Sequence, residues 1–182
     1  MASPPASLAI RPEAPADHLA ISRVVAAAFG SQTEADLVDR IRASPEYVPE
    51  IALVAERDGA IVGHVMISHA VIRNEGGDRR ISMLSPLAVD PAHQRRGVGR
   101  ALVERALDIA DSCGEPIVIL EGSPAYYGQL GFEHSLRYGI EIHLPSWAPP
   151  EAAQVKLLSS FDPGDPTLRG TVVYPPAFDG LE

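Results

Sequence analysis

The residues best suited to chemistry form a basic, glycine-containing run over residues 93–100, HQRRGVGR. This run lies between a segment expected to be a strand and a segment expected to be a helix. The first backbone amides of a helix have no intrahelical partner and the helix dipole is positive there, so such a position suits an anion. Gly97 and Gly99 lack a Cβ and let a phosphate approach the main chain. Further positive charge, which suits a ligand with several phosphates, comes from Arg95, Arg96 and Arg100.

Other interpretations of this run remain open. It is also compatible with a basic turn whose arginines are solvated. A P-loop is excluded because no Gly-Lys-Ser/Thr follows, and the dinucleotide fingerprint lacks its third glycine, where Leu102 stands. However, Glu121 follows about 20 residues later at an expected strand end, where an acid could bind a ribose. A dinucleotide-binding oxidoreductase is therefore kept as a remote alternative.

Two helices are expected near the N-terminus. Apolar residues at helical spacing predict a helix over residues 17–29, with Asp17 as its N-cap and Gly30 as its stop. Residues 31–34, SQTE, form a capping-box pattern that predicts a second helix ending near Ser44. These helices are adjacent in the chain.

Antiparallel strands are expected on either side of this helix pair. A short strand is predicted over residues 8–11, before the helices. After them, residues 51–55 and 61–67 flank the dipeptide Asp-Gly at 58–59, which favours a tight hairpin. A glycine-containing break at 74–78 separates the following strands. The pattern predicts a meander of antiparallel strands.

A parallel strand pair should follow the meander. The strand over residues 81–89 carries Pro86, which has no N–H for a neighbouring strand, so the sheet should be locally opened there. A helix from Val98 to Cys113 and a strand over residues 117–120 come next. A strand, helix, strand unit of this length places its two strands parallel.

Composition and charge exclude several classes of protein. The chain has 182 residues, 46% hydrophobic and 21% charged, which is typical of one folded domain with an appendage. A net charge of -9 argues against general nucleic-acid binding. The single Cys113 allows no intrachain disulfide, and no apolar run reaches the ~20 residues that span a bilayer. We expect a cytoplasmic protein without export or membrane signals, with residues 1–7 as a disordered tail.

The basic run resembles the Gln/Arg-x-x-Gly-x-Gly/Ala signature of the GNAT superfamily of N-acetyltransferases, and it follows a strand and an Asp90-Pro91 pair as in that family. The resemblance implies an α/β (α+β) GNAT acyl-CoA N-acyltransferase fold, with a mixed central sheet, a splayed central strand pair and flanking helices. It also implies acetyl-CoA as cosubstrate and no metal. The implied acetyl-CoA-binding residues are Leu87, Ala88, Val89, Gln94, Arg95, Arg96, Gly97, Val98, Gly99, Arg100, Tyr126 and Tyr127.

Residues 124–132, PAYYGQLGF, resemble the second GNAT signature, and Tyr127 falls on the family's tyrosine. The resemblance makes Tyr127 a candidate general acid for the departing thiolate. A tyrosine with a pKa near ~10 is at least as basic as a thiolate near ~8.5, so transfer depends on geometry and timing. Packing of a short helix is the alternative role for both tyrosines, and Tyr126 is otherwise a wall of the site.

The general base is harder to assign from the sequence. Glu121 is a candidate base, with an exposed strand-end carboxylate as the plainer interpretation, and water serves in some family members. Glu34 is a candidate substrate residue, although completing a capping box already accounts for it. The six histidines do not predict a metal site, because none of them has the HExxH spacing. His64 and His69 are an odd number of residues apart on one strand, so their side chains point to opposite faces.

These observations define the functional expectations. Residues 8–134 should form the acetyltransferase core, and residues 135–182 a C-terminal extension that completes the sheet and the substrate side. Residues 170–178, GTVVYPPAF, resemble the end of a bacterial GNAT subgroup with added strands. The expected function is direct transfer of an acetyl group, in a ternary complex, to a primary amine of a small molecule or protein. An acyl-CoA sensor without turnover is the alternative. The expected partners are acetyl-CoA and an amine acceptor, without nucleic acid or membrane, and a homodimer is left open.

Overall fold

The computed structural model describes residues 7–181, so all but the last residue of the expected tail lies outside the described residues. The chain forms two compact units, and each is assembled from separate stretches. The first contains the chain up to Ile67 together with Ser85–Leu107, and the second contains Ser68–Leu84 together with the chain from Asp108 onward. Two long strands and one helix contribute residues to both units: β3 (Ala60–Asn74), β4 (Gly77–Val89) and α3 (Val98–Ser112).

The sheet of the first unit follows the predicted meander. β1 (Ala9–Pro12) pairs antiparallel with β2 (Ala52–Arg57), which pairs antiparallel with the first part of β3. The turn between β2 and β3 contains Asp58 and Gly59, with φ values of 53° and 77°. Two successive positive φ angles match the right-handed twist of a hairpin, which confirms the predicted turn.

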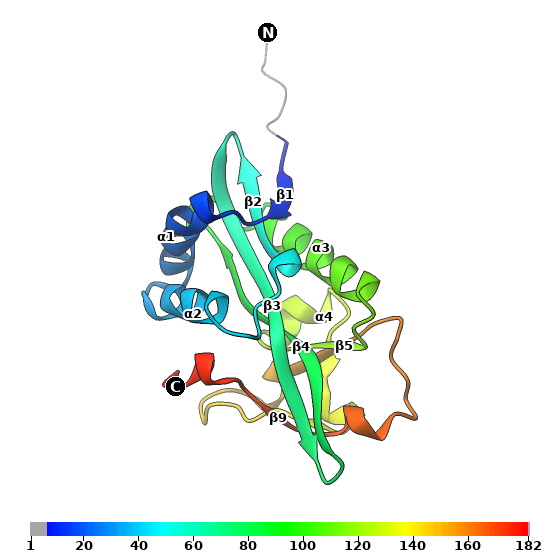
Figure 1. Cartoon of the computed structure of the whole chain (residues 1–182). Coiled ribbons are helices and arrows are strands. Elements are labelled where there is room, and N and C mark those ends of the chain that lie inside the picture. Colours follow the sequence, from blue (N-terminus) through cyan, green and yellow to red (C-terminus); the bar gives the residue numbers. More distant parts are fainter. Residues whose placement is uncertain (1–6, 182) are drawn as a thin grey trace. The chain divides into compact units, whose positions relative to one another are not determined.

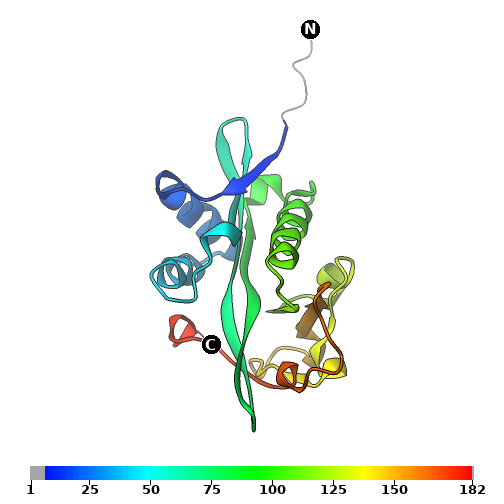
Figure 2. The ribbon, with the colours of Figure 1, turned by 45° about the vertical axis from the view of Figure 1, so that its right-hand side comes forward.

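Two helices of the first unit lie on one side of its strands. Figures 1 and 2 show α1 (His18–Phe29) and α2 (Thr33–Arg42) on one side of β2 and β3, with the start of α3 on the other. Gly30 stops α1 in the left-handed conformation, as predicted, with φ 71°. Apolar residues of both helices are buried in the core, among them Ile21, Val25, Leu37 and Ile41.

The predicted helix starts need correction. Asp17 occupies the N-cap position of α1 but does not cap it, because its carboxylate accepts from the Ala14 amide at 2.8 Å and pairs with Arg11 at 2.7 Å. Ser31 and Glu34 do interact, but not as a capping box: the serine hydroxyl donates to the glutamate at 2.7 Å. α2 also ends at Arg42, earlier than predicted.

The second unit contains a mixed sheet. β5 runs parallel to β4 and antiparallel to β8, and β8 also pairs antiparallel with β6. β9 pairs antiparallel with the second part of β3 and parallel with β7. The bounds are β5 (Ile117–Glu121), β6 (Glu133–His134), β7 (Ile140–Glu141), β8 (Ala153–Leu157) and β9 (Gly170–Val173).

The β4–β5 pairing is short, as Pro86 leads us to expect. The register joins Ser82 to Val118 and Met83 to Ile119. Among the described residues this pairing does not continue to Pro86, whose lack of an N–H prevents a regular ladder. The predicted parallel arrangement is therefore confirmed, and so is the α/β fold class with a mixed sheet and flanking helices.

The remaining helices are short. α4 (Pro124–Gly128) begins after Ser123, whose hydroxyl accepts from the Tyr126 amide at 3.3 Å.

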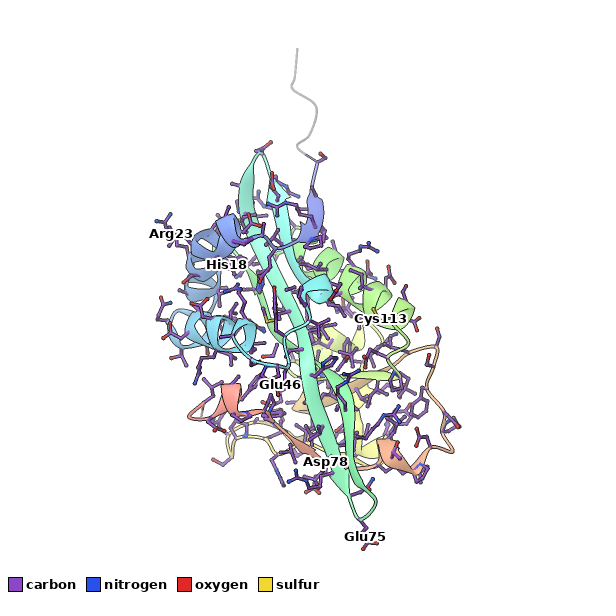
Figure 3. All side chains as sticks on the ribbon, viewed as in Figure 1. His18, Arg23, Glu46, Glu75, Asp78 and Cys113 are labelled. Atoms are coloured by element: carbon purple, nitrogen blue, oxygen red, sulfur yellow. The ribbon has the colours of Figure 1, made fainter. Side chains whose placement is uncertain are left out.

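Cys113, at the C-terminal end of α3 (Figure 3), is exposed rather than packed in the core. No helix in residues 7–181 is long and apolar enough to cross a membrane. Single 3₁₀ turns cover Pro15–Asp17, Pro49–Ile51, Pro91–His93, Ser135–Tyr138, Pro150–Ala152, Pro166–Leu168 and Pro176–Phe178.

Candidate active site

The start of α3 in the first unit has the geometry of an anion site. At the N-terminal end of α3, the first hydrogen bond of the helical ladder runs from the Ala101 amide to the Gly97 carbonyl oxygen at 3.1 Å. The amides of residues 98–100 therefore precede the intrahelical ladder and are available to a ligand. Gly97 has φ 82°, and a Cβ there would meet no atom within 4 Å. The space in front of Gly97 is therefore open to an incoming group.

Three exposed arginines lie in the loop and first turn at this helix start, namely Arg95, Arg96 and Arg100. Arg95 adopts a φ of 60°, which is uncommon for a residue with a side chain and is part of the loop's shape. Arg100 pairs with Glu104 one turn later, at 2.8 Å between Nε and Oε1. That pair is exposed on both sides, so solvent screening leaves it weak. A phosphate could therefore replace Glu104 as the partner of Arg100 at small cost.

The end of β4 leads into this loop. Leu87 and Val89 are half-buried and Ala88 is buried, so the strand alternates as its position in a sheet requires. The Gln94 carboxamide donates to the Val89 carbonyl at 3.1 Å. Gln94 thus ties the loop to the last residue of the strand.

Gly63 in β3 was not singled out by the sequence analysis, yet it sets the position of α3. A Cβ there would lie 2.8 Å from Leu102 Cδ1, 3.0 Å from Val98 Cγ1 and 3.3 Å from the Ala88 carbonyl oxygen. Only a residue without a side chain allows this approach. The small residue is a signal in the sequence, but nothing there says which helix packs against it.

In the second unit, Tyr127 packs against the end of β5. A Cβ on Gly122 would lie 2.5 Å from Tyr127 Cε2, so the ring lies directly over this glycine. The ring also makes edge contacts with Tyr126 and Phe132, at centroid distances of 4.9 and 5.6 Å. Burial raises the pKa of Tyr127 well above its usual value, and Tyr126 adds to the effect. Gly122 is a second residue that the sequence analysis missed.

Glu121, the last residue of β5, has a hydrogen-bonding partner from the C-terminal part of the chain. Tyr174, which directly follows β9, donates its hydroxyl to Oε1 of Glu121. Glu121 as a whole residue is exposed to solvent, but the protein atoms around its carboxyl group partly desolvate that group and raise its pKa. The Tyr174 hydrogen bond opposes this and lowers the pKa, but by less. A carboxylate with a raised pKa accepts protons more readily than a surface glutamate.

Other candidate residues have structural explanations. Glu34 is half-buried and accepts from Ser31, which accounts for its position at the start of α2. His64 is fully buried with Nε2 3.0 Å from Glu13, whereas His69 lies 3.8 Å from Glu115. Within residues 7–181, no group of three His, Cys, Asp or Glu side chains has the arrangement of a metal site.

The two units thus hold different parts of the predicted site. The β4 end, residues 94–100 and the start of α3 come together in the first unit. Glu121, Tyr126 and Tyr127 belong to the second unit, where the Tyr127 ring packs over Gly122, the residue after Glu121.

Comparison with known proteins identifies the family. Residues 9–135 match the acetyltransferase (GNAT) domain family. The chain is 32% identical to the uncharacterized N-acetyltransferase YhbS of Escherichia coli (strain K12), over 75% of this chain and 80% of YhbS. It is 34% identical to the uncharacterized N-acetyltransferase YjhQ of the same organism, over 62% of each chain, so the match spans less than two thirds of YjhQ. The chain belongs to the GNAT family of N-acetyltransferases.

Solved structures agree with this assignment. The structure of Escherichia coli YhbS in complex with CoA superposes with a TM-score of 0.87 at 30% identity, covering 100% of this chain and 97% of YhbS. A GNAT family acetyltransferase from Brucella melitensis, in complex with acetyl-CoA, superposes with a TM-score of 0.74 at 29% identity, covering 95% of this chain and 99% of the other. The expected fold and the expected class of enzyme are confirmed.

Proposed function

We propose that this protein transfers the acetyl group of acetyl-CoA directly to a primary amine of a small molecule or protein. The observation that carries the proposal is the start of α3. The space in front of Gly97 is open there, the first amides of the helix have no intrahelical partner, and three arginines lie in the same stretch of the chain. Complexes of two similar proteins with CoA and acetyl-CoA support this ligand. The net charge of -9 favours a cationic acceptor, which an amine becomes on protonation.

The proposed contacts follow the chain from β4 into α3. Leu87, Ala88 and Val89 meet the pantetheine arm through their main chain. Residues 94–100 hold the pyrophosphate, because helix-start amides and guanidinium groups both donate to phosphate oxygens. In the second unit, Tyr126 forms a wall for the ligand and Tyr127 reaches its sulfur.

The proposed reaction is a single transfer within a ternary complex. The cationic amine first loses one proton to solvent, because only the neutral amine has a free electron pair. Its nitrogen then attacks the acetyl carbonyl carbon, an N–C bond forms and the C–S bond of the thioester breaks. Glu121 accepts the proton that the amine loses, and the sulfur leaves as a thiolate that takes a proton from Tyr127. The products are an N-acetylated amine and CoA, and exchange with solvent returns the proton from Glu121 to Tyr127.

Tyr127 as general acid places a condition on timing. Its pKa, raised by burial, lies even further above that of a thiolate near ~8.5 than an ordinary tyrosine would. Proton donation must therefore accompany C–S cleavage rather than precede it. Replacing Tyr127 with phenylalanine should lower the rate of CoA release while leaving acetyl-CoA affinity close to that of the wild type.

Thermal unfolding with acetyl-CoA, CoA, NAD or no ligand tests the binding step. A ligand that binds only the native state at ~100 times its dissociation constant adds about 2.7 kcal/mol of stability, so the melting temperature should rise clearly. We expect a rise with acetyl-CoA and CoA and none with NAD. A rise with NAD alone would favour the oxidoreductase alternative instead.

Two variants of glycines that flank α3 localise the binding. Gly97→Glu places a side chain and a negative charge where a phosphate should lie, and we expect at least a tenfold loss of acetyl-CoA affinity. Gly114→Glu is the matched control, since this glycine, at the other end of α3, also has a positive φ (81°) and open space around a Cβ. Equal affinity in both variants would contradict the loop assignment. Tight binding without CoA release in any amine panel would support the sensing alternative.

A further inference from the structure

Tyr174 is the residue from the C-terminal part of the chain that reaches the proposed base. Its hydroxyl donates to Oε1 of Glu121, 53 residues earlier in the chain, and both residues belong to the second unit. Among the residues that the structure describes, none donates a hydrogen bond to Oε2. One carboxylate oxygen is therefore held in place while the other is left to accept a proton.

The backbone directly before Tyr174 is held by strand pairing, and its ring is held by an aromatic neighbour. β9 pairs antiparallel with β3, with Val173 opposite Val71, and parallel with β7. At the start of β9, Gly170 allows close approach, because a Cβ there would lie 2.3 Å from the Arg73 carbonyl oxygen. The Tyr174 ring contacts Phe178 at a centroid distance of 5.4 Å, with the ring planes 45° apart. The hydroxyl is thus presented to Glu121 by a strand and an aromatic neighbour.

The neighbours of Glu121 leave Tyr174 as the group that controls its carboxylate. On the adjacent strand β8, Ala153 lies opposite Glu121, and Gln154 directs its uncharged amide to the Gly122 carbonyl at 2.9 Å. Among the described titratable groups, Tyr174 is the one whose hydrogen bond favours the ionised form of Glu121, against the desolvation of the site. A neutral donor holds the carboxylate in place without adding a positive charge beside it. A lysine or arginine would add that charge and lower the pKa of the carboxyl further.

We infer that Tyr174 is a positioning residue for the acetyl transfer, holding Oε1 of Glu121 so that Oε2 faces the amine and receives its proton. Tyr174 keeps its own proton throughout, so the amine proton ends on Glu121 and the thiolate is protonated separately. The inference rests on the proposed function and extends it by giving residues 135–182 a role in the chemistry.

The test compares pH profiles of kcat/KM for CoA release in the wild type and in Tyr174→Phe. Removing the donor takes away the interaction that favours the carboxylate, so the acid limb of the profile should move to higher pH by roughly one unit. Below the limb the rate should fall roughly tenfold, and above it the rate should recover. A merely structural role would lower the rate equally at every pH. Melting curves verify that the variant, which retains its aromatic ring, remains folded.

Tyr138→Phe is the matched control in the same unit. Tyr138 donates to Oε1 of Glu133 at 2.9 Å, so the change removes another tyrosine to glutamate hydrogen bond without altering the environment of Glu121. We expect its profile to match the wild type. In a Glu121→Gln background, Tyr174→Phe should cause no further change in the profile, because the two residues act as one unit.

The outcomes separate the inference from the proposed function. A wild type that acetylates an amine while Tyr174→Phe keeps the wild-type acid limb overturns the inference alone. A shift of the same size in Tyr138→Phe also overturns it, because the effect would then not depend on Glu121. A wild type that binds acetyl-CoA but acetylates no amine overturns the proposed function, and the inference falls with it.

Discussion

Two glutamates of this protein have opposite electrostatic environments. In the first unit, the Glu13 side chain is 1% exposed and contacts Arg42 at 2.7 Å, Tyr47 at 2.8 Å and His64 at 3.0 Å. Desolvation raises the pKa of Glu13, but the hydrogen bonds from His64 and Arg42 outweigh it and hold the pKa well below its usual range. In the second unit, Tyr174 is the one hydrogen-bond donor to Glu121 among residues 7–181, and desolvation keeps the pKa of Glu121 above its usual value.

The difference in environment suits the two glutamates to different roles. A carboxylate that accepts from a guanidinium, a hydroxyl and an imidazole is stabilised as an anion and is a poor proton acceptor. Its contacts join the chain after β1 to α2 and β3, which makes Glu13 a structural anchor. A carboxylate with one neutral donor and partial desolvation has a higher proton affinity, which suits a general base.

The largest expected effect separates the two glutamates by activity. Glu121→Gln removes the proposed proton acceptor, and the rate of CoA release at saturating amine should fall about 10²- to 10⁴-fold. Acetyl-CoA affinity, measured by calorimetry, should change little because residues 94–100 are untouched. A wild-type rate in this variant would show that water or another group, and not Glu121, acts as the base.

The next effect concerns stability. Glu13→Gln removes the buried charged partner of Arg42 and leaves it, among the described residues, with the exposed Asp39. The free energy of unfolding should drop by about 3 kcal/mol, the lower end of the cost of breaking a buried ion pair. Urea denaturation gives this value directly. Glu121→Gln is the control. Because Glu121 is exposed, the free energy of unfolding of this variant should drop far less. Equal losses in both variants would remove the distinction between anchor and base.

Gly122→Ala tests how β5 positions the tyrosine. The new methyl group would lie 2.5 Å from Tyr127 Cε2, so the ring must move. Misplacement of a reacting group by about 1 Å can lower a rate by about 100-fold, and we expect a loss approaching that size. Gly128→Ala in α4, where a Cβ meets no atom within 4 Å, should retain the wild-type rate.

The smallest effect is the pH dependence of stability. The folded pKa of Glu13 is lowered, so its stabilisation is present above its ordinary pKa of ~4.3 and is lost as pH falls below it. Burial also lowers the pKa of His64, so the unfolded chain takes up a proton first as pH falls below ~6.5. Both groups act in the same direction, each with a slope of at most about 1.4 kcal/mol per pH unit.

Urea denaturation between pH 7 and pH 4 measures this dependence. Stability should decline with falling pH, and His64→Gln should flatten the decline between about pH 6.5 and pH 4.5. An unchanged decline in that variant would show that His64 already takes up its proton in the folded state.

The sequence predicted the parts of the fold that depend on local patterns. Gly30 and the Asp58-Gly59 turn require positive φ angles, and Pro86 has no N–H to donate to a neighbouring strand, so these positions are informative without tertiary contacts. Asp17 was misjudged as an N-cap because its partner Arg11, in β1, could not be inferred from helix patterns. Local rules fail where a distant partner is stronger.

The candidate site was predictable to the same extent. The run at residues 93–100 and the tyrosine segment are contiguous motifs, so they could be read directly. Gly63 and Gly122 matter through the side chains that pack over them, and Tyr174 through its contact with Glu121. These contacts join residues far apart in the chain or depend on side-chain direction, which the sequence pattern does not specify.

The most direct test of the central claim is CoA release from acetyl-CoA by the wild-type protein, measured across a panel of primary amines at saturating acetyl-CoA. We predict that at least one amine produces CoA and an equal amount of N-acetylated product. Acetyl-CoA binding without CoA release, in a panel that includes small amines, polyamines and peptides with free amino groups, would contradict the account.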